Sequence, residues 1–394
     1  MNKLSELGEW LWMEARLGAP PVLQRTVIAR LHEAKEIART TIKSQLTVYQ
    51  WKGQNDGGDL TVIYAGWGYS APMLQSLLFN SKPLEKQIGQ LSISNPGETL
   101  NNFVGDITII EAGQQIIDKI PQQKGVFVLP FRLHFTFDTE SEWTNIESRF
   151  RRDARRNEIR KTERFGYDYE ISRRKEDLEM FYHTMYVPTA ENRHGDLASI
   201  ISKREAYQVL RHGLLFLVKR DGSYVSGGLS YFEDGRLRFK DMGVLNGDQQ
   251  LMKEGAVGAM NYLRIVWAHK EGYRGVNLGQ CWPYMSGIYL SKRKWGAVVS
   301  VPPNEHKQIW IKIQQSSPAV THFLAENPCV IVNKNKNLQG LIVNKERQIT
   351  SEMRETWDKL YDTPGLEKLV ILSPEELIDQ TAPLSELNTQ ISLT

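Results

Sequence analysis

The stretch "LLFLVKRDGSYVSGGLSYFEDGRLRFKDMGVL", residues 214–245, decides the fold of this chain. Two Asp-Gly dipeptides, at 221–222 and 234–235, interrupt runs that are otherwise rich in apolar residues. Asp-Gly between strand-like runs is a strong signal for a β-hairpin, because a tight hairpin turn needs residues that tolerate positive φ. The stretch therefore predicts three antiparallel strands, at about 214–219, 224–232 and 236–245.

A helix and a further strand follow the three predicted strands. Apolar residues in the segment 252–270 recur at the spacing of one helical face: Met252, Ala256, Ala259, Leu263 and Val266. This helix is expected to end at Gly272, and "YRGVNLG" (273–279) predicts the next strand. A long helix over residues 142–166 and a shorter one at 201–211 precede the hairpins. The resulting order, β-β-β-α-β, indicates a mixed α/β unit.

The flanking regions predict two smaller α/β units. Residues 1–40 have a helical pattern, and strand-like runs such as "QLTVYQW" (45–51) then alternate with short helical stretches up to about residue 130. After residue 304, "VIVNKNKNLQGLIVN", "ITSEMRETWDKLY" and "LEKLVILSPEELI" predict a small α/β appendage, in which Ser373 starts a helix. We therefore predict three domains, over residues 1–130, 131–304 and 305–394.

Composition narrows the class of protein. A formal net charge of +3 argues against a protein that coats DNA, although local basic patches are compatible with it. Two cysteines are too few for a disulfide framework and fit a reducing compartment. The first residues lack the apolar core of a signal peptide, and no apolar run is long enough to span a membrane. These features predict a cytoplasmic protein without a membrane span.

One glycine-rich stretch has the spacing of a nucleotide loop. In "YAGWGYSAP" (64–72), Gly66, Gly68 and Ala71 follow a predicted strand and precede a predicted helix, as in dinucleotide-binding proteins. No Asp or Glu closes the next predicted strand, "QLSIS" (90–94), where the acidic partner of this motif is expected. A tight turn that needs glycine is the alternative. HExxH, CxxC and P-loop patterns are also missing, so neither a metal site nor a P-loop is expected.

Arginines form a regular series in the predicted helix 142–166. The series has spacings of three and four, which would place all of its members on one helical stripe: Arg149, Arg152, Arg156, Arg160 and Arg164. Such a stripe suits a ligand that carries phosphates, including RNA. The alternative is a solvated helix on which acidic residues balance the arginines. Arg152 and Arg156 are our candidate phosphate-binding residues.

Other polar residues are weaker candidates. Asp241, at the end of a predicted strand, and Tyr284 are possible general bases, although a lone Asp there is more often structural. The motif "ENRHG" (191–195) predicts a loop that carries Arg193 and His194, which we place among the candidate substrate-binding residues. A surface or capping role is the alternative for His194.

A resemblance emerges from six segments taken in order: "LPFRLHFTFD", "RRDARRNEIRKTERFGYDYEIS", "FYHTMYVPTAENRHG", "KRDGSYVSGGLSY", "EGAVGAMNYLRIVWAHKEGYRGVNLG" and "GIYLSKRKWG". Together they resemble the Gcn5-related N-acetyltransferase (GNAT) superfamily, and within it the FemABX-like branch. The resemblance covers about residues 125–300 well and residues 40–125 vaguely. It implies an α/β fold of tandem GNAT-like units with a central mixed sheet, of which the first is degenerate.

The resemblance also implies where the acyl donor binds. GNAT sheets split near the end of the third antiparallel strand, and the acyl donor and the acceptor amine meet at that split. In many acyltransferases a glycine loop before the next helix binds the pyrophosphate of coenzyme A through backbone N–H groups. The corresponding stretch here is "QQLMKEGAVGA", with Lys253, Gly255 and Gly258, and it departs from the usual loop pattern. FemABX proteins instead take an aminoacyl group from a charged tRNA.

The resemblance places Lys292 at the reaction centre. In "GIYLSKRKWGA" (287–297) it stands where FemABX proteins have a lysine before an aromatic-glycine pair, here Trp295-Gly296. Such a lysine would stabilise the oxyanion that forms in acyl transfer. We expect a strand here, with Lys292 and Lys294 on one face, and Lys294 is a further candidate for substrate binding. A basic strand edge that discourages aggregation is the alternative.

Three functions follow from these observations. The first is an N-acyltransferase that moves an acyl group from an activated donor, with acyl-CoA as the expected co-substrate, to a small-molecule amine acceptor. The second is an aminoacyl-tRNA-dependent transferase of the FemABX type. It is favoured by the arginine series and by the loop "QQLMKEGAVGA", which departs from the usual pattern for coenzyme A. The third is a non-catalytic module that binds a ligand or RNA.

Overall fold

The computed structural model describes residues 3–20, 23, 27, 30–31, 34, 45–100, 102–121, 123–195, 198, 200–303, 305–345 and 349–379. The chain divides into two compact units, each assembled from separated segments. Unit 1 comprises Met1–Arg30, His134–Gly279 and Lys292–Val298, and unit 2 comprises Leu31–Leu133, Gln280–Ser291 and Val299–Thr394. The sequence predicts three consecutive domains with boundaries near residues 130 and 304, and those boundaries stay a prediction.

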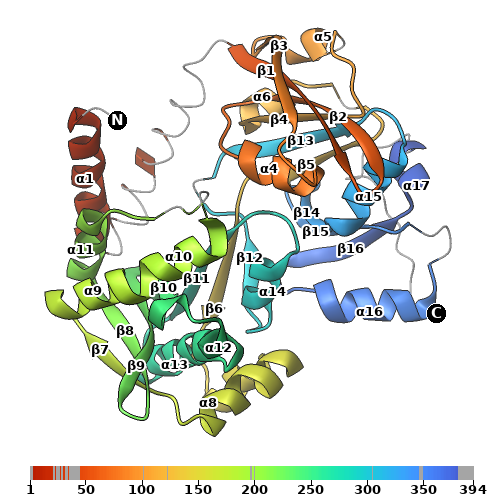
Figure 1. The fold of residues 1–394 in the computed structure, drawn as a ribbon. Helices are drawn as coiled ribbons and strands as arrows, with labels where there is room; N and C mark the ends of the chain where they lie inside the picture. The colour runs from red at the N-terminus through yellow and green to blue at the C-terminus, as the bar shows by residue number, and fades with distance from the viewer. Residues whose placement is uncertain are drawn as a thin grey trace. The chain divides into compact units, whose positions relative to one another are not determined.

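Unit 1 is built on a seven-stranded mixed sheet with the order β12-β6-β11-β10-β9-β8-β7 (Figure 1). In chain order its strands are β6 (Leu133–Asp138), β7 (Asp168–Ser172), β8 (Gly213–Arg220), β9 (Ser223–Glu233), β10 (Arg236–Val244), β11 (Gly275–Cys281) and β12 (Val298–Ser300). Antiparallel pairing joins β8, β9 and β10, and both connecting turns have an aspartate at positive φ, Asp221 and Asp234. The three strands predicted from the Asp-Gly turns are confirmed.

The strands β10 and β11 separate part of the way along β10. They are parallel and paired only between Arg236–Arg238 and Gly275–Asn277. Beyond this point β10 continues to Val244 beside β9 alone, with a bulge between Phe239 and Asp241. Because a bulge bends its strand, β10 turns away from β11 there. We call the place where their pairing ends the split.

Helices cover both faces of the unit 1 sheet. On one face lie α9 (Lys175–Phe181), η3 (Tyr182–Tyr186), α10 (Val187–His194) and α11 (Lys203–Arg211), and part of the core there consists of Phe181, Met185 and Val209 packed on Leu215, Leu217 and Leu229. The crossover helix α13 (Ala256–Lys270) lies on the other face. Strand side chains alternate between the two faces, so Phe216 contacts α13 while its neighbours Leu215 and Leu217 face the first group. The predicted order β-β-β-α-β is confirmed.

The predicted long helix over residues 142–166 is wrong, because the segment is broken. It consists of α7 (Trp143–Ser148), the π-helix η2 (Ala154–Ile159) and α8 (Arg160–Arg164), with non-helical residues after α7. Ile146, Phe150 and Ala154 are buried. In the π-helix η2 the backbone hydrogen bonds join residues i and i+5, which changes the number of residues per turn. The spacing of the arginines therefore does not produce one continuous stripe.

Two further elements differ from the prediction. The helix expected at 252–270 is divided at Gly255, which has φ +94° and separates α12 (Gln249–Lys253) from α13. The strand expected around Lys292 is instead a helix, α14 (Gly287–Arg293). Successive side chains of a helix are about 100° apart, so the expected alternation of Lys292, Arg293 and Lys294 does not apply. The apolar run Ile288–Leu290 is too short to distinguish helix from strand by its pattern.

Unit 2 contains a six-stranded mixed sheet with the order β3-β1-β2-β4-β13-β5. Its strands are β1 (Gln45–Asn55), β2 (Gly58–Ala65), β3 (Leu84–Ser92), β4 (Ile107–Gly113), β5 (Val126–Pro130) and β13 (Lys307–Ile313). The strand β13 comes from the region predicted as an appendage, yet it lies between β4 and β5. The accompanying helices are α4 (Ala71–Leu78), α5 (Pro96–Leu100), α6 (Gln114–Ile117) and α15 (Pro318–Glu326).

The end of unit 2 is a three-stranded sheet with the order β14-β15-β16. It consists of β14 (Cys329–Val332), β15 (Leu338–Val343) and β16 (Leu366–Leu372), with the helices α16 (Ser351–Tyr361) and α17 (Pro374–Asp379). Ser373 caps α17 as predicted: its Oγ accepts from Glu376 N at 3.2 Å, and its own N–H donates to Glu376 Oε2 at 2.7 Å. The appendage predicted over residues 305–394 stays a prediction as a separate domain, and its first strand, β13, pairs within the six-stranded sheet.

The chain as a whole belongs to the mixed α/β class, as predicted. The N-terminal helix α1 covers Lys3–Gly18, and most of the helical pattern predicted between residues 21 and 40 lies outside the described residues. Within the described ranges, no helix combines the length and the apolar character that crossing a membrane requires.

Candidate active site

Lys292 lies at the split of unit 1. It belongs to the last turn of α14, and its Nζ donates a hydrogen bond to the carbonyl oxygen of Leu278 on β11. Leu278 directly follows Asn277, the last β11 residue paired with β10. The half-buried ammonium group is therefore held by a backbone carbonyl at the point where the two strands part. Partial burial strengthens its electric field compared with that of a lysine in water.

Gly279 keeps space open beside this ammonium group. Its φ is +81°, and a Cβ atom there would lie 3.7 Å from Lys292 Nζ and 3.4 Å from the carbonyl oxygen of Phe239 on β10. The Gly279 N–H donates to the side chain of Asn277 at 2.9 Å. Lys292, Gly279 and Phe239 thus meet at the split, where the missing side chain of Gly279 leaves room for a single atom next to the cation.

Asp241 lies two residues beyond Phe239, just after the bulge. Burial raises the pKa of its carboxyl group, and the nearby Lys240 and a hydrogen bond with Tyr186 only partly oppose this. Oδ2 of Asp241 is buried and has no hydrogen-bond partner among the described residues. A carboxylate with a raised pKa and an unused oxygen has the properties of a general base. The structure thus places Asp241 and Lys292 in the same unit, both near the split.

Tyr284 belongs to unit 2, unlike Lys292 and Asp241. It is 4% exposed in the core of that unit and pairs with Cys329 in a β-bridge. Burial raises the pKa of its hydroxyl group well above the ordinary value of 10.0. A tyrosine that stays protonated inside a core is suited to packing rather than to accepting a proton near neutral pH.

Side chains of unit 1 cover the loop proposed to bind coenzyme A. Gly258 is in the first turn of α13, where a Cβ atom would lie 1.6 Å from Glu158 Oε2. The Glu158 carboxylate also forms an ion pair with Lys294 Nζ, and both side chains are less than one-fifth exposed. A carboxylate therefore lies at the helix N-terminus, where an anionic phosphate would otherwise be favoured.

Lys161 covers the other end of the same loop. Its Nζ donates to the carbonyl oxygen of Lys253 at 2.7 Å. Its aliphatic stem lies against Gly255, where an added Cβ would be 3.0 Å from Lys161 Cδ. The structure therefore assigns Gly255 and Gly258 to close packing against Lys161 and Glu158, which sequence spacing alone does not reveal.

The candidate phosphate-binding arginines are exposed on unit 1. Arg152 and Arg156 lie before and within η2, on the solvent side of that segment. Arg149 differs, because its guanidinium stacks 4.2 Å from the Phe137 ring and donates to the Asp138 carbonyl. Arg193 is exposed on α10. Residues 191–194 form the last turn of that helix, so the predicted loop is wrong, and the side chain of His194 lies outside the described residues.

The glycine-rich loop 64–72 also holds a carboxylate of the protein itself. Glu111 of β4 is fully buried, and its Oε2 accepts hydrogen bonds from the Tyr64 hydroxyl at 2.7 Å and from Ser70 N at 2.8 Å. Ser70 caps α4, so this carboxylate lies at the start of that helix. A Cβ atom at Gly66 would be 2.7 Å from the Tyr64 hydroxyl. The packing alternative, a glycine required by a tight turn, explains the motif.

Sequence reasoning missed His134, which lies on β6 beside the paired part of β11. Burial lowers its pKa to about 4, Arg238 lowers it further, and a hydrogen bond with Asn277 opposes the shift. His134 Nε2 is buried without a hydrogen-bond partner among the described residues. The signal was available in the segment "LHFTFD", where Leu133, Phe135 and Phe137 alternate with His134 and Thr136. This alternation places His134 on the face of the strand opposite to the buried phenylalanines.

The lowered pKa of His134 predicts a pH dependence of stability. Between pH 6.5, its ordinary pKa, and about 4, the unfolded chain protonates this histidine while the folded chain does not. The free energy of unfolding should therefore fall as the pH falls through this window, by on the order of 1–3 kcal/mol. Urea denaturation at pH 7 and pH 4.5 measures this fall. His134→Gln should lose this part of it and His322→Gln, in α15, should retain it, whereas equal falls in all three proteins would contradict the prediction.

Arg264 is the second residue that sequence reasoning missed. It is 1% exposed on α13, and its guanidinium stacks 4.5 Å from the Phe239 ring beneath the bulge. Gly228 of β9 makes room for it, because a Cβ there would lie 1.7 Å from the guanidinium. Burial lowers its pKa to about 9, and Asp241 opposes the shift. Arg264 is the only charged residue between Gly255 and Ala268, which marks it in the sequence.

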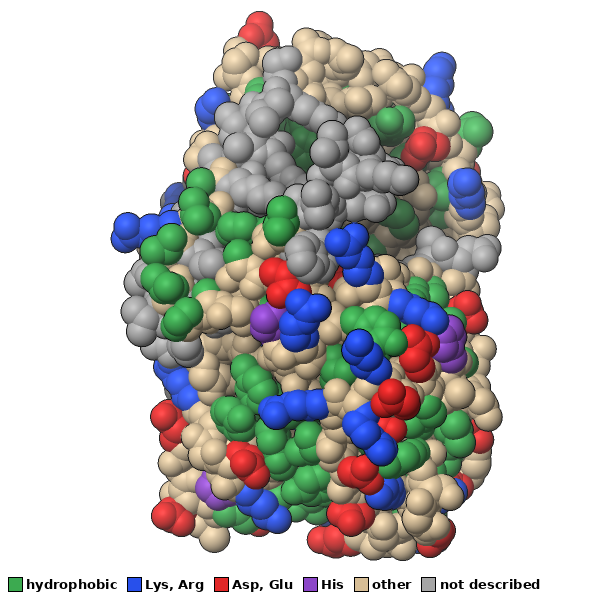
Figure 2. Space-filling model, turned by 90° about the vertical axis from the view of Figure 1, so that its left-hand side faces the viewer, with side chains coloured by type: hydrophobic (Ala, Val, Ile, Leu, Met, Phe, Trp, Pro, Cys, Tyr) green, Lys and Arg blue, Asp and Glu red, His purple; other side chains and the backbone are tan. Residues whose placement is uncertain are grey.

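Charge is evenly mixed on the face of the molecule that Figure 2 shows, where basic and acidic side chains alternate rather than gathering by sign. Within the described part of the chain, no group of three or more His, Cys, Asp or Glu side chains is arranged to hold a metal ion.

Neither a protein-family model nor a curated protein matches the chain. Solved structures similar to it include FemX, with 14% identity and a TM-score of 0.37. The match covers 72% of this chain and 96% of that one. L-PGS from Bacillus licheniformis has 12% identity, a TM-score of 0.30, and coverage of 69% and 87%. A GCN5-related N-acetyltransferase from Anabaena variabilis ATCC 29413 has 10% identity, a TM-score of 0.27, and coverage of 84% and 74%. Likenesses of this strength do not assign an activity, which has to come from the residues themselves.

Proposed function

We propose that this protein is an N-acyltransferase whose reaction takes place at the split of unit 1. The observation that supports this most directly is the position of Lys292, whose ammonium group lies on the Leu278 carbonyl beside Gly279, where the missing side chain leaves room for a single atom. A cation held in advance at such a place suits a reaction that develops negative charge on an oxygen atom.

The proposed reaction is the transfer of an acyl group from an ester or thioester to an amine. The amine nitrogen attacks the carbonyl carbon, and the carbonyl oxygen becomes an oxyanion that Lys292 stabilises. The C–O or C–S bond of the donor then breaks, and an amide bond remains. The leaving alcohol or thiol takes up the electron pair and a proton, so that no oxidant or metal is needed for the balance.

Asp241 is the proposed acceptor of the proton that the amine loses. Its raised pKa favours proton uptake, and its unused Oδ2 provides the lone pair. Arg264 lies beneath the same bulge, and its positive charge limits how far the pKa of Asp241 rises. The proton passes to Asp241 directly or through a water molecule.

Two donors are compatible with this chemistry, and one observation favours the second. Acyl-CoA would place its pyrophosphate at the start of α13, where Glu158 and Lys161 already lie against the glycines. An aminoacyl ester on tRNA does not need this loop, and the exposed Arg152 and Arg156 suit its phosphates. We therefore propose an aminoacyl-tRNA as the donor ahead of acyl-CoA.

The tRNA donor predicts binding that weakens steeply with salt. If Arg152 and Arg156 each neutralise one phosphate, Arg152→Ala with Arg156→Ala should reduce the slope of log Kd against log salt by about 1.5. Filter binding of total charged tRNA between 50 and 200 mM salt, roughly the range in which counterion release dominates, measures this slope. Lys345→Ala with Lys359→Ala removes the same charge from unit 2 and should leave the slope unchanged. Equal slopes in all three proteins would exclude the arginines from the binding site.

The proposed function is tested with a panel of donors and amines. Radiolabelled acyl-CoA esters and charged tRNA are each incubated with the protein and with amino acids, short peptides and amino sugars. Formation of a labelled amide supports the proposal, and the active donor decides between the two candidates. Tight binding of a donor without transfer to any amine would favour the non-catalytic alternative.

A further inference from the structure

A cavity of about 390 Å³ lies in unit 2, whereas the proposed reaction takes place in unit 1. Its floor is apolar and includes Trp310 of β13, Val128 of β5 and Ile120, which follows α6. Trp310 is only 3% exposed and Val128 is half-buried, so the floor is a wall of the core rather than a loose surface. The volume falls in the range of small-molecule sites, roughly 300–1,000 Å³.

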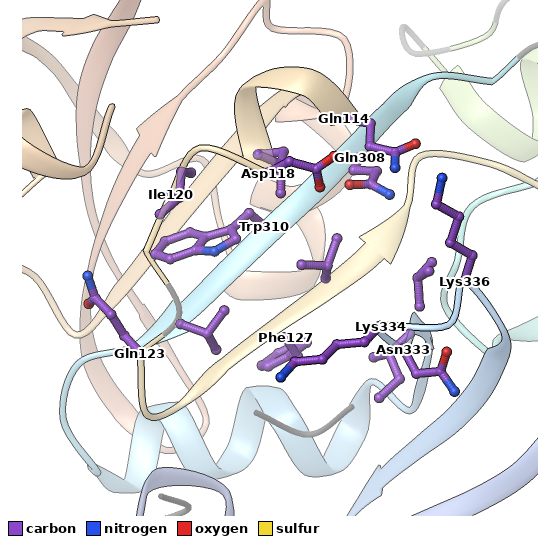
Figure 3. A pocket seen from close by; sticks show the side chains of 15 residues that line it. Gln114, Asp118, Ile120, Gln123, Phe127, Gln308, Trp310, Asn333, Lys334 and Lys336 are labelled. Carbon is purple, nitrogen blue, oxygen red and sulfur yellow. The ribbon is translucent and has the colours of Figure 1, made fainter. Parts of the chain in front are cut away.

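Opposite charges stand on two rims of this cavity, as Figure 3 shows. One rim carries Asp118 with the amides of Gln114 and Gln308, and the facing rim carries Lys334 and Asn333. Lys336 stands at the side, on the same turn as Lys334. A ligand that spans the apolar floor therefore meets a carboxylate at one end and ammonium groups at the other.

The turn that carries the lysines is held in place. Asn333 is 6% exposed; its Oδ1 accepts from Asn337 N at 2.9 Å, and its Nδ2 donates to Glu367 at 2.8 Å. Lys336 has a φ of 62°, which fixes the reversal of the chain. Because the turn is tied both to itself and to β16, the cationic rim is organised before any ligand binds.

The opposite rim is also fixed. Asp118 caps the C-terminus of α6, and its N–H donates to the carbonyl oxygen of Gln114 at 2.8 Å. The Gln114 N–H in turn donates to the His306 carbonyl at 2.7 Å, next to β13. Asp118 is exposed and lines the cavity, while its backbone is held at the end of α6.

We infer that this cavity binds a short peptide zwitterion, of the size of a dipeptide or tripeptide, with a large apolar side chain. The ligand's ammonium group lies at Asp118, its carboxylate lies between Lys334 and Lys336, and its side chain lies on Trp310 and Val128. Neither the oxyanion chemistry at the split nor the choice of donor depends on this site.

Calorimetric titration with three related probes tests this inference. Glycyl-L-tryptophan carries both terminal charges, glycyl-L-tryptophan amide lacks the carboxylate and N-acetylglycyl-L-tryptophan lacks the ammonium group. Each charge-assisted hydrogen bond that is lost should weaken binding about tenfold, so glycyl-L-tryptophan should bind tightest. L-tryptophan, whose two charges lie on one carbon atom, should also bind more weakly than glycyl-L-tryptophan.

Variants at the two rims separate the charges. Asp118→Asn should weaken binding of glycyl-L-tryptophan and of its amide but not of N-acetylglycyl-L-tryptophan. Lys334→Ala with Lys336→Ala should weaken binding of glycyl-L-tryptophan and of the N-acetyl compound but not of the amide. Lys345→Ala with Lys359→Ala removes the same charge from unit 2 outside the cavity lining and should change none of the three. All these side chains are exposed, so the variants should fold as the parent protein does.

Three outcomes would overturn the inference. The first is the absence of saturable binding of all four probes at millimolar concentration. The second is binding that none of the rim variants alters, which places the probes elsewhere. The third is N-acetylglycyl-L-tryptophan binding as tightly as glycyl-L-tryptophan with no effect of Asp118→Asn, which assigns the cavity to an amphipathic anion instead. Because acyl transfer is measured separately, a failure here leaves the proposed function intact.

Discussion

Replacing Lys292 with alanine is expected to lower the rate of acyl transfer by about 100- to 1,000-fold, the usual effect of removing one oxyanion stabiliser. The reason is that Lys292 Nζ is fixed at the split by the Leu278 carbonyl and acts where negative charge develops. The loss should appear mainly in kcat, because the interaction strengthens in the transition state. The measurement is amide formation with the donor that the panel identifies.

Two further variants test whether the loss of rate is specific to the positive charge of Lys292. Ser291→Ala changes the exposed neighbour of Lys292 and should retain the parent rate, and Lys292→Arg should retain part of it, because the charge remains. Thermal unfolding of each variant separates a loss of catalysis from a loss of folding. Full activity of Lys292→Ala would remove Lys292 from the reaction.

The second large effect is expected at Gly296, in the Trp-Gly pair after Lys292. Gly296 has φ +71°, and a Cβ atom there would lie 2.2 Å from the carbonyl oxygen of Arg149. Gly296→Ala therefore combines an unfavourable backbone conformation with a collision against backbone. We expect the free energy of unfolding to fall by about 2–4 kcal/mol. Urea denaturation measures it.

Gly287, at the other end of α14, provides the matched control. A Cβ atom at Gly287 would meet no atom within 4 Å, so Gly287→Ala should change stability by only about 0.5 kcal/mol in either direction. Equal stability of the two variants would show that the chain can relax around Gly296. The contrast matters for the site, because Gly296 follows Trp295, whose ring packs 5.6 Å from that of Phe150.

The central sheet of unit 1 was predictable from sequence because its signals are local. The two Asp-Gly turns fix three strands, and a strand of alternating character or a helix of apolar spacing needs no distant partner to be identified. The breaks at Gly255 and in η2 were not predictable in this way. Both depend on packing against α13, where Glu158 and Lys161 lie on Gly258 and Gly255.

The placement of β13 shows a second limit of sequence patterns. Its residues alternate like those of any strand, yet they pair with β4 and β5, more than 170 positions earlier in the chain. Pairing over such a separation is decided by tertiary packing, which a local pattern does not contain. A boundary drawn at residue 304 therefore separates β13 from the sheet that it completes.

Glycine spacing was misleading at both loops that resemble phosphate sites. In each loop a carboxylate of the protein lies at the start of a helix, Glu111 at α4 and Glu158 at α13. Negative side chains stabilise helix N-termini for the same electrostatic reason that phosphates do. Gly66 and Gly258 are needed because a Cβ atom there would collide with the side chain of that glutamate, so the same spacing results from two different causes.

The candidate site was only partly visible in the sequence. Lys292 and Asp241 were candidates from the sequence, but the link between them, the end of pairing between β10 and β11, exists only in three dimensions. His134 and Arg264 were missed because a single charged or titratable residue in an apolar segment is a weak signal that belongs to no motif. Their burial, which shifts the pKa of both side chains, depends on the packed sheet and helix.

The central claim, that the donor binds at the split, is tested most directly by hydrogen–deuterium exchange with and without charged tRNA or acyl-CoA. The account predicts slower exchange in peptides covering residues 236–247 and 275–296 when the active donor is present, with little change in β1 to β3. Saturable binding of a donor that leaves both peptides unchanged and protects another region would contradict it.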